Sequence, residues 1–168
     1  FNTGELQYYG TDIYMAISEE PAERMFNGYD KTFNSTAPIV GDYWKVLYKV
    51  VQESNILLNR CTPDIAGNDY TSLTAQARFF RAMAYYYLVE TFGPVPLLTE
   101  ENTSVIQQAE RTGEQAIYTF IITELNDIKD KLEMTTISAG KVTNAAVIHF
   151  LGKMYLTRAY KSFAETDD

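Results

Sequence analysis

The chain has 168 residues, enough for one domain with a sizeable core, because a chain of this size buries about 68–70% of the surface that it exposes when unfolded. Its 46% of apolar residues exclude an intrinsically disordered chain, and 14 Lys and Arg against 22 Asp and Glu give a net charge of −8. This acidic balance argues against nucleic acid and against an anionic membrane surface as partners, since both require a basic patch.

Residues 1–41 are predicted to be mostly irregular. One short helix is expected over residues 12–20, and Gly and Pro interrupt the rest at intervals too short for a long helix. A long loop without secondary structure is more often functional than not, and this one is unusually rich in Tyr, Phe and Asn. The loop is therefore the most informative region for function.

The first long helix is predicted over residues 42–60, with Asp42 as its N-cap and Thr62-Pro63 as its stop. Spacings of three and four place one stripe of residues on a single face: Trp44, Leu47, Tyr48, Val51, Asn55 and Leu58. The indole of Trp44 could stack on a sugar ring, but its place on this stripe favours a role in the core.

A second helix is predicted over residues 72–92, where two apolar stripes indicate a central helix packed on two sides. Gly93-Pro94 ends it, and Pro94 and Pro96 force the segment 93–111 to start in an extended form. A charge on such a packed helix is expected to be paired, so Arg81 should form a buried ion pair or bind a backbone carbonyl.

Two further helices complete the predicted set. The third should begin at a capping box, Thr112 to Gln115, and continue to Leu132, with Glu124 on its solvated face. The fourth should begin at Thr143 and run towards Phe163, with His149 as a hydrogen-bonded core residue. Since no strand-like alternation competes, the predicted fold class is all-α.

The fourth helix also matches part of a repeat signature. Leu151-Gly152-Lys153-Met154-Tyr155, followed by Ala159 and Phe163, fits the tetratricopeptide pattern, although the spacing of the pairs exceeds a strict 34-residue repeat. We therefore expect degenerate tetratricopeptide-like helix pairs joined by long irregular loops.

Four stretches carry a more specific pattern, in order along the chain. They are Gly10-Thr11-Asp12; Trp44 to Tyr48 with Asn55 to Leu58; Ala77 to Ala82 with Tyr86 to Val89 and Phe92 to Leu97; and Gly140 to Thr143 with Ala145-Ala146 and Tyr155-Leu156. In order and spacing these resemble the bacterial outer-membrane SusD/RagB-like proteins over nearly the whole chain. Gln76 and Glu124 depart from the pattern, where Glu and Asp are usual, and either could alter a local salt bridge.

The resemblance implies a function that composition could not. It implies a non-catalytic surface lipoprotein that binds a nutrient, most often a glycan, and delivers it to a TonB-dependent (SusC-like) outer-membrane transporter. It implies localisation at the outer-membrane surface, no cofactor, and contact with the membrane only through an N-terminal lipid anchor missing from this chain. Residues 1–168 would be the N-terminal portion of a SusD-like domain, with irregular loops over about 1–41, a helical scaffold over about 42–168 and the C-terminal half absent.

The candidate ligand-binding residues lie in the loop before the first long helix. Tyr29, Asp30, Phe33 and Asn34 combine flat apolar faces with planar hydrogen-bonding groups, the mixture that sugars require. An equally open alternative is that these residues pack against the absent half or the transporter. No metal site or catalytic residue is predicted, since Cys61 and His149 are the sole thiol and imidazole.

Two other functions remain open at this point. The chain could be a tetratricopeptide-type protein-interaction scaffold without a small ligand of its own. A helical glycoside hydrolase would need two carboxylates facing each other across a cleft, and the adjacent pairs Glu19-Glu20 and Glu100-Glu101 are poorly suited because their side chains diverge.

Overall fold

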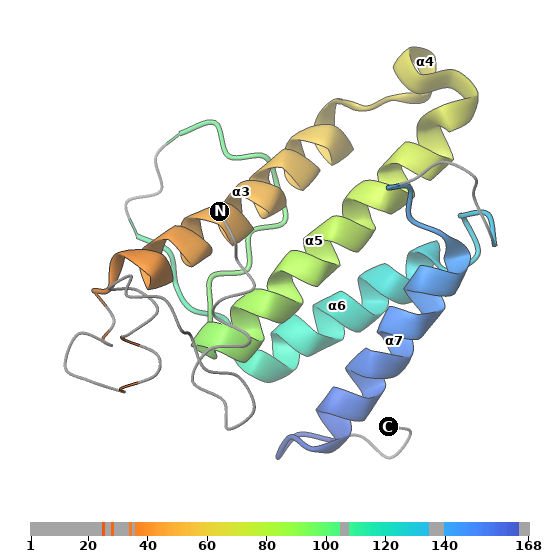
Figure 1. Cartoon of the computed structure of the whole chain (residues 1–168). Helices are drawn as coiled ribbons and strands as arrows, with labels where there is room; N and C mark the ends of the chain where they lie inside the picture. The colour runs from red at the N-terminus through yellow and green to blue at the C-terminus, as the bar shows by residue number, and fades with distance from the viewer. Residues whose placement is uncertain are drawn as a thin grey trace. The chain divides into compact units, whose positions relative to one another are not determined.

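The computed structural model describes residues 25, 28, 34, 36–104, 108–134 and 140–164, and in these ranges the chain is helical (Figure 1). The elements are α3 (Pro38–Arg60), α4 (Pro63–Ala66), the short 3-10 helix η1 (Gly67–Asp69), α5 (Tyr70–Phe92), α6 (Glu114–Ile128) and α7 (Asn144–Ala159). Within the same ranges the sole β pairing is one antiparallel bridge between Val95 and Thr112. The all-α prediction is confirmed, whereas the helix predicted over 12–20 lies outside the described residues.

The chain divides into two compact units, Phe1–Val46 and Leu47–Asp168. In the first unit, Met25 and Ala37 are buried, and Ile39 and Val40 at the start of α3 pack against them. The second unit contains the rest of α3 and all the later helices.

Helix α3 begins four residues before its predicted start. The prediction treated Pro38 as a breaker and Asp42 as the N-cap, and it was wrong because proline fits the first turn of a helix, where its missing N–H costs nothing. Asp42 lies instead inside α3, where it pairs with Lys45 at 3.2 Å. The predicted end is confirmed, since α3 stops at Arg60 and Pro63 opens the next short helix.

Helix α5 is the centre of the second unit, as its two apolar stripes predicted. Ala82, Tyr85 and Leu88 are fully buried, and Figure 1 shows α6 running back along α5, with α7 next to α6. Gly93 ends α5 at a φ of 68°, a left-handed conformation that favours glycine, and its N–H donates to the carbonyl of Val89 at 2.9 Å.

The N-cap predicted for α6 is wrong, whereas the one predicted for α7 is confirmed. The predicted capping box at α6 is absent: Gly113 is the N-cap, and the N–H of Thr112 instead donates to the carbonyl of Val95 at 2.9 Å in the β-bridge. At α7 the predicted cap is confirmed, since the Thr143 hydroxyl accepts a hydrogen bond from the N–H of Ala146 at 3.2 Å. Helix α7 ends at Ala159, short of the predicted Phe163. The antiparallel succession of α5, α6 and α7 is consistent with tetratricopeptide-like helix pairs.

Candidate functional site

The extended segment 94–104 is held along α3 by polar side chains of that helix. The Tyr48 hydroxyl donates to the carbonyl of Pro96 at 2.7 Å, and the Asn55 amide donates to the carbonyls of Leu98 and Glu100 at 3.0 and 2.9 Å. Gln52 both donates to and accepts from the backbone of Asn102, at 2.9 and 3.2 Å. Because Tyr48, Gln52 and Asn55 recur at spacings of four and three, they form one polar face of α3 that binds the backbone of segment 94–104.

Helix α5 holds the same segment from another direction. The Tyr85 hydroxyl donates to the carbonyl of Leu98 at 2.9 Å and accepts from its N–H at 2.6 Å. Burial raises the pKa of Tyr85 to about 12, since an ionised phenolate would be poorly solvated there. Tyr85 therefore remains a neutral hydroxyl that satisfies both backbone groups of Leu98.

A buried ion pair lies beneath the segment. Arg81 donates from Nη2 and Nε to Glu124 Oε2 at 2.5 and 3.1 Å, and from Nη1 to Asn55 Oδ1 at 2.8 Å and to the carbonyl of Thr99 at 3.0 Å. Both predicted roles of Arg81 are thus confirmed: it forms a buried ion pair and it binds a backbone carbonyl.

The prediction that Glu124 is solvated was wrong, because Glu124 is only 6% exposed. Glu124 lies three residues after Ile121 and four before Ile128, so the spacing that marks the buried stripe of α6 includes it. The prediction was wrong because a charged residue was taken to be solvated. Arg81 on α5 was itself expected to need a buried partner, and that expectation could have indicated an acidic residue on the buried face of α6.

The end of α3 adds a third contact to the segment. Glu101 accepts from Arg60 Nε at 3.1 Å and from Asn59 Nδ2 at 2.8 Å, and it also contacts Arg60 Nη2. The hydrogen bond from Arg60, followed by that from Asn59, lowers the pKa of Glu101 below its usual value. Segment 94–104 is consequently fixed by α3 along its length.

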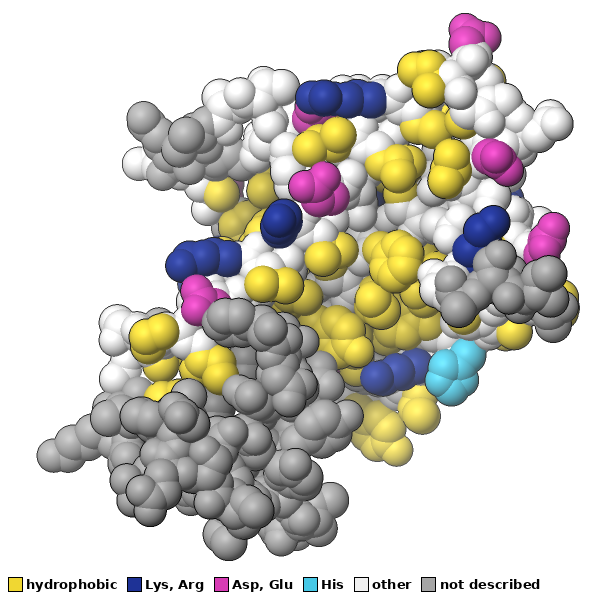
Figure 2. All heavy atoms as spheres, turned by 45° about the horizontal axis from the view of Figure 1, so that its top comes forward, with side chains coloured by type: hydrophobic (Ala, Val, Ile, Leu, Met, Phe, Trp, Pro, Cys, Tyr) yellow, Lys and Arg dark blue, Asp and Glu magenta, His cyan; other side chains and the backbone are white. Residues whose placement is uncertain are grey.

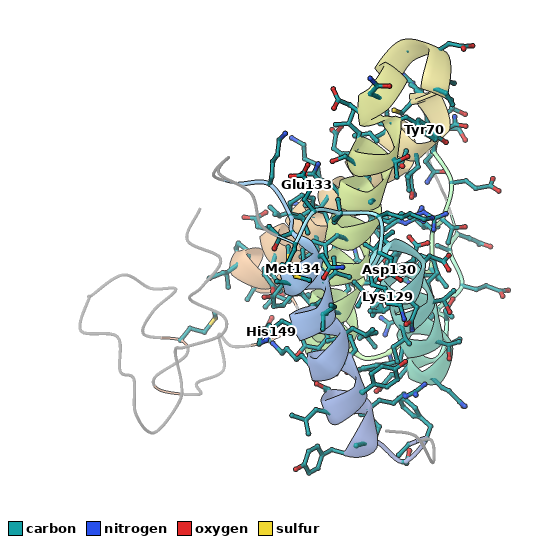
Figure 3. The ribbon with its side chains drawn as sticks, turned by 90° about the vertical axis from the view of Figure 1, so that its right-hand side faces the viewer. Tyr70, Lys129, Asp130, Glu133, Met134 and His149 are labelled. Carbon is teal, nitrogen blue, oxygen red and sulfur yellow. The ribbon has the colours of Figure 1, made fainter. Side chains whose placement is uncertain are left out.

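An open pocket of about 400 Å³ lies in the second unit, between the end of α3, the first turns of α5 and the end of α6. Figure 3 labels Tyr70, at the start of α5, which is one of the residues that line this pocket. The lining residues are Leu58, Tyr70, Thr71, Thr74, Ala75, Arg78, Arg81, Thr99, Ile128 and Lys131. Sequence reasoning missed this pocket, because its walls come from four separate parts of the chain.

Of the predicted ligand-binding residues, Tyr29, Asp30 and Phe33 lie outside the described residues. Asn34 is exposed, and its Oδ1 accepts from both the N–H and the hydroxyl of Thr36, at 2.9 and 2.6 Å. These bonds give Asn34 a local role in the turn before α3. The predicted set is neither assembled nor separated by the described residues, and it remains a prediction.

Trp44 and His149 both differ in burial from the core positions of their helices. Trp44 is half-buried on α3. The prediction of a core histidine was wrong: His149 is exposed on α7, between the buried positions Val147 and Phe150 (Figure 3). Figure 2 shows hydrophobic side chains gathered beside this histidine on the surface of the molecule.

The described residues form neither a metal site nor a membrane-spanning helix. No group of three or more His, Cys, Asp or Glu residues among them could hold a metal ion. None of the helices among the described residues is long and apolar enough to cross a membrane.

Known proteins resemble this chain in sequence. A family model for SusD-like proteins, described as "Starch-binding associating with outer membrane", matches residues 2–156. A SusD-like protein of Bacteroides ovatus is 32% identical over 122 residues, which cover 69% of this chain and 22% of that protein. SusD-like protein P2 of Formosa agariphila is 30% identical over 123 residues, covering 71% of this chain and 24% of that protein.

Solved structures resemble it in fold. A laminarin-binding SusD-like protein superposes with a TM-score of 0.71 at 29% identity, over 82% of this chain and 30% of its own. A crystal structure with xylogluco-oligosaccharide superposes with a TM-score of 0.72 at 27% identity, over 84% of this chain and 28% of its own. The chain thus spans less than a third of the length of each of these relatives. Proteins of this family bind carbohydrate without catalysing a reaction and associate with the outer membrane. The family match over residues 2–156 and the agreement in fold show that this chain belongs to the SusD-like family.

Proposed function

We propose that this chain forms part of a longer, non-catalytic protein that binds a glycan at the bacterial cell surface and delivers it to a TonB-dependent outer-membrane transporter. Residues 1–168 would be its N-terminal portion, and an N-terminal lipid would anchor it to the outer membrane. The observation that carries the proposal is the likeness to the laminarin-binding relative, which is 29% identical and has a TM-score of 0.71. No bond is made or broken in the proposed function, so capture depends on a preformed surface.

The fixed scaffold of the second unit supports such capture. Segment 94–104 is bound by side chains of α3 and α5, and the Arg81–Glu124 pair joins α5 to α6 beneath it. Rigid elements hold a binding surface precisely, since less entropy is lost when the ligand binds, and this advantage applies to surfaces of the second unit itself.

We assign glycan contact to the loop that precedes α3, with Tyr29 and Phe33 as stacking residues and Asp30 and Asn34 as hydrogen-bonding residues. Aromatic rings cover the C–H face of a sugar, while carboxylate and amide groups bind its hydroxyls. The two bonds from Thr36 to Asn34 Oδ1 make Asn34 the weakest member of this set.

Native affinity electrophoresis of the full-length gene product, across a panel of soluble polysaccharides that includes laminarin and xyloglucan, tests the function. We expect retardation by at least one polymer, and roughly tenfold weaker binding when Tyr29→Ala and Phe33→Ala are combined, since aromatic anchors carry much of the energy of an interface. Tyr160→Ala is the matched control, because Tyr160 is 86% exposed and lies at the end of α7. Retardation that the double variant leaves unchanged would refute the loop assignment alone.

A protein-interaction scaffold is the second candidate function. It is favoured by large apolar residues exposed on and just after α7: Ile148 is 51% exposed, Leu156 62% and Tyr160 86%. A protein that is retarded by no polysaccharide, and whose transporter complex survives without glycan, would support this candidate instead.

A further inference from the structure

The pocket between α3, α5 and α6 has the composition of a sugar site rather than of a packing defect. Its accessible apolar surface comes from the half-buried Leu58 and Tyr70, whereas Ala75 and Ile128 are almost completely buried. Tyr70, Thr71 and Thr99, which carry hydroxyl groups, are also among the lining residues. At about 400 Å³ the pocket falls within the usual size range of small-ligand sites, roughly 300–1,000 Å³.

The charged residues that line the pocket differ in how many of their N–H groups already donate hydrogen bonds. Arg81 is largely satisfied, since it already donates four hydrogen bonds, to Glu124, Asn55 and Thr99. Arg78 contacts Asp127 at 3.1 Å and Glu124 at 3.8 Å through Nη1 alone, so its Nε and Nη2 hydrogens stay available among the described residues.

Lys131 completes the set. It is exposed at the rim, and no described residue forms an ion pair or hydrogen bond with its ammonium group. Three cationic side chains line the pocket, and Glu124 and Asp127 compensate two of them. The pocket therefore retains one positive charge, from Lys131, on a chain whose net charge is −8.

One uncompensated positive charge fits a single carboxylate better than a doubly charged phosphate. A guanidinium with free donors beside an ammonium is a suitable pair for a carboxylate, because charge-assisted hydrogen bonds are stronger than neutral ones. The hydroxyl-bearing residues and the apolar surface of Leu58 and Tyr70 then suit the ring that carries this carboxylate.

We propose that this pocket binds a uronic acid unit of a glycan, with the sugar carboxylate on Lys131 and Arg78 and the ring against Leu58 and Tyr70. The proposal rests on the proposed function, to which it adds a class of acidic sugar and a site away from the loop before α3.

Isothermal titration of the full-length protein with trigalacturonate tests the proposal, with the methyl ester of trigalacturonate as the uncharged probe. We expect binding of trigalacturonate and roughly tenfold weaker binding of the ester, which loses the charge-assisted bonds. Lys131→Gln should weaken trigalacturonate binding by a similar factor. Lys129→Gln is the control, because it removes the same charge two residues away, from a residue that does not line the pocket.

A second variant separates pocket shape from charge. Thr71→Leu narrows the pocket at an exposed position and leaves the net charge unchanged, and it should also weaken binding. Equal affinities of the Lys131→Gln and Lys129→Gln variants would overturn the proposal, as would no binding of trigalacturonate. If neutral polysaccharides still retard such a protein, the uronate pocket alone is refuted; if no polysaccharide or trigalacturonate binds, the proposed function fails with it.

Discussion

At Arg81, a guanidinium that is only 5% exposed contacts a carboxylate on α6, an amide on α3 and a carbonyl of segment 94–104. Removing a charge from water costs several kcal/mol of free energy. The attraction to its partner offsets this cost only if the geometry of the pair is good. The pair is consequently a strong constraint on how α5 and α6 meet, whatever its net contribution to the free energy of unfolding.

Glu124→Leu should lower the free energy of unfolding by about 3–5 kcal/mol, because it leaves the Arg81 charge buried without its carboxylate. Arg81→Met combined with Glu124→Leu should recover most of this loss, since no charge is then stranded. Urea denaturation of both variants checks the prediction. The control is Asp127→Ala, whose exposed partnership with Arg78 should contribute less than about 1 kcal/mol; an equal effect of Glu124→Leu and Asp127→Ala would contradict it.

The buried hydroxyl of Tyr85 should make the free energy of unfolding sensitive to alkaline pH. Its pKa is about 12 in the folded chain and about 10 when unfolded, so the unfolded state loses this proton first. The contribution to stability is complete below pH 10 and is lost as the pH rises from 10 towards 12, on the order of 1–3 kcal/mol. Burial also raises the pKa of Tyr48, which acts in the same direction.

Urea midpoints measured from pH 8 to pH 11 should therefore fall more steeply for the wild type than for Tyr85→Phe. Tyr160→Phe, at an exposed position, should follow the wild type. Parallel curves for the wild type and Tyr85→Phe would show that ionisation of Tyr85 does not contribute.

At the scale of elements, segment 94–104 has little regular structure of its own and depends on the helices beside it. Its carbonyls at Pro96, Leu98, Thr99 and Glu100 all accept bonds from side chains of α3 or α5. Buried backbone groups that are left without partners are costly, so these side chains decide where the segment lies.

Asn55→Leu should release this segment, because the carbonyls of Leu98 and Glu100 lose their shared donor, at a cost of about 2–3 kcal/mol. Hydrogen exchange should accelerate at the amides of Leu98 and Asn102 and remain unchanged in the middle of α6. Ser54→Ala is the matched control, since the Ser54 hydroxyl bonds only to the carbonyl of Val50 in its own helix. Unchanged exchange at Leu98 in the Asn55 variant would refute this account.

The elements themselves were largely predictable from local patterns. The four long helices, the Thr143 cap and the stops at Gly93 and Pro63 follow from periodicity and from local backbone chemistry. The errors arose where a local rule had two outcomes: Pro38 opened a helix instead of ending a loop, and the backbone of Thr112 formed a bridge instead of a cap.

At the scale of the whole molecule, the chain has a net charge of −8, a helical scaffold and a match to the SusD-like family over residues 2–156. It spans less than a third of the relatives with which it superposes, so the proposed capture of a glycan concerns a larger assembly than this chain. The exposed apolar residues of α7 are a further surface on which such an assembly could form.

The sequence by itself determined the fold class, the long helices and the family, because periodicity and short motifs are properties of neighbouring residues. Tertiary structure alone decided that Glu124 is buried, that α3 binds segment 94–104 and that a cationic pocket exists. Arg81 and Glu124 are 43 positions apart and Tyr48 and Pro96 are 48 apart, and local patterns carry no information on such pairs. Only the packing of α3, α5 and α6 brings these groups within hydrogen-bond distance, and packing depends on the whole chain at once.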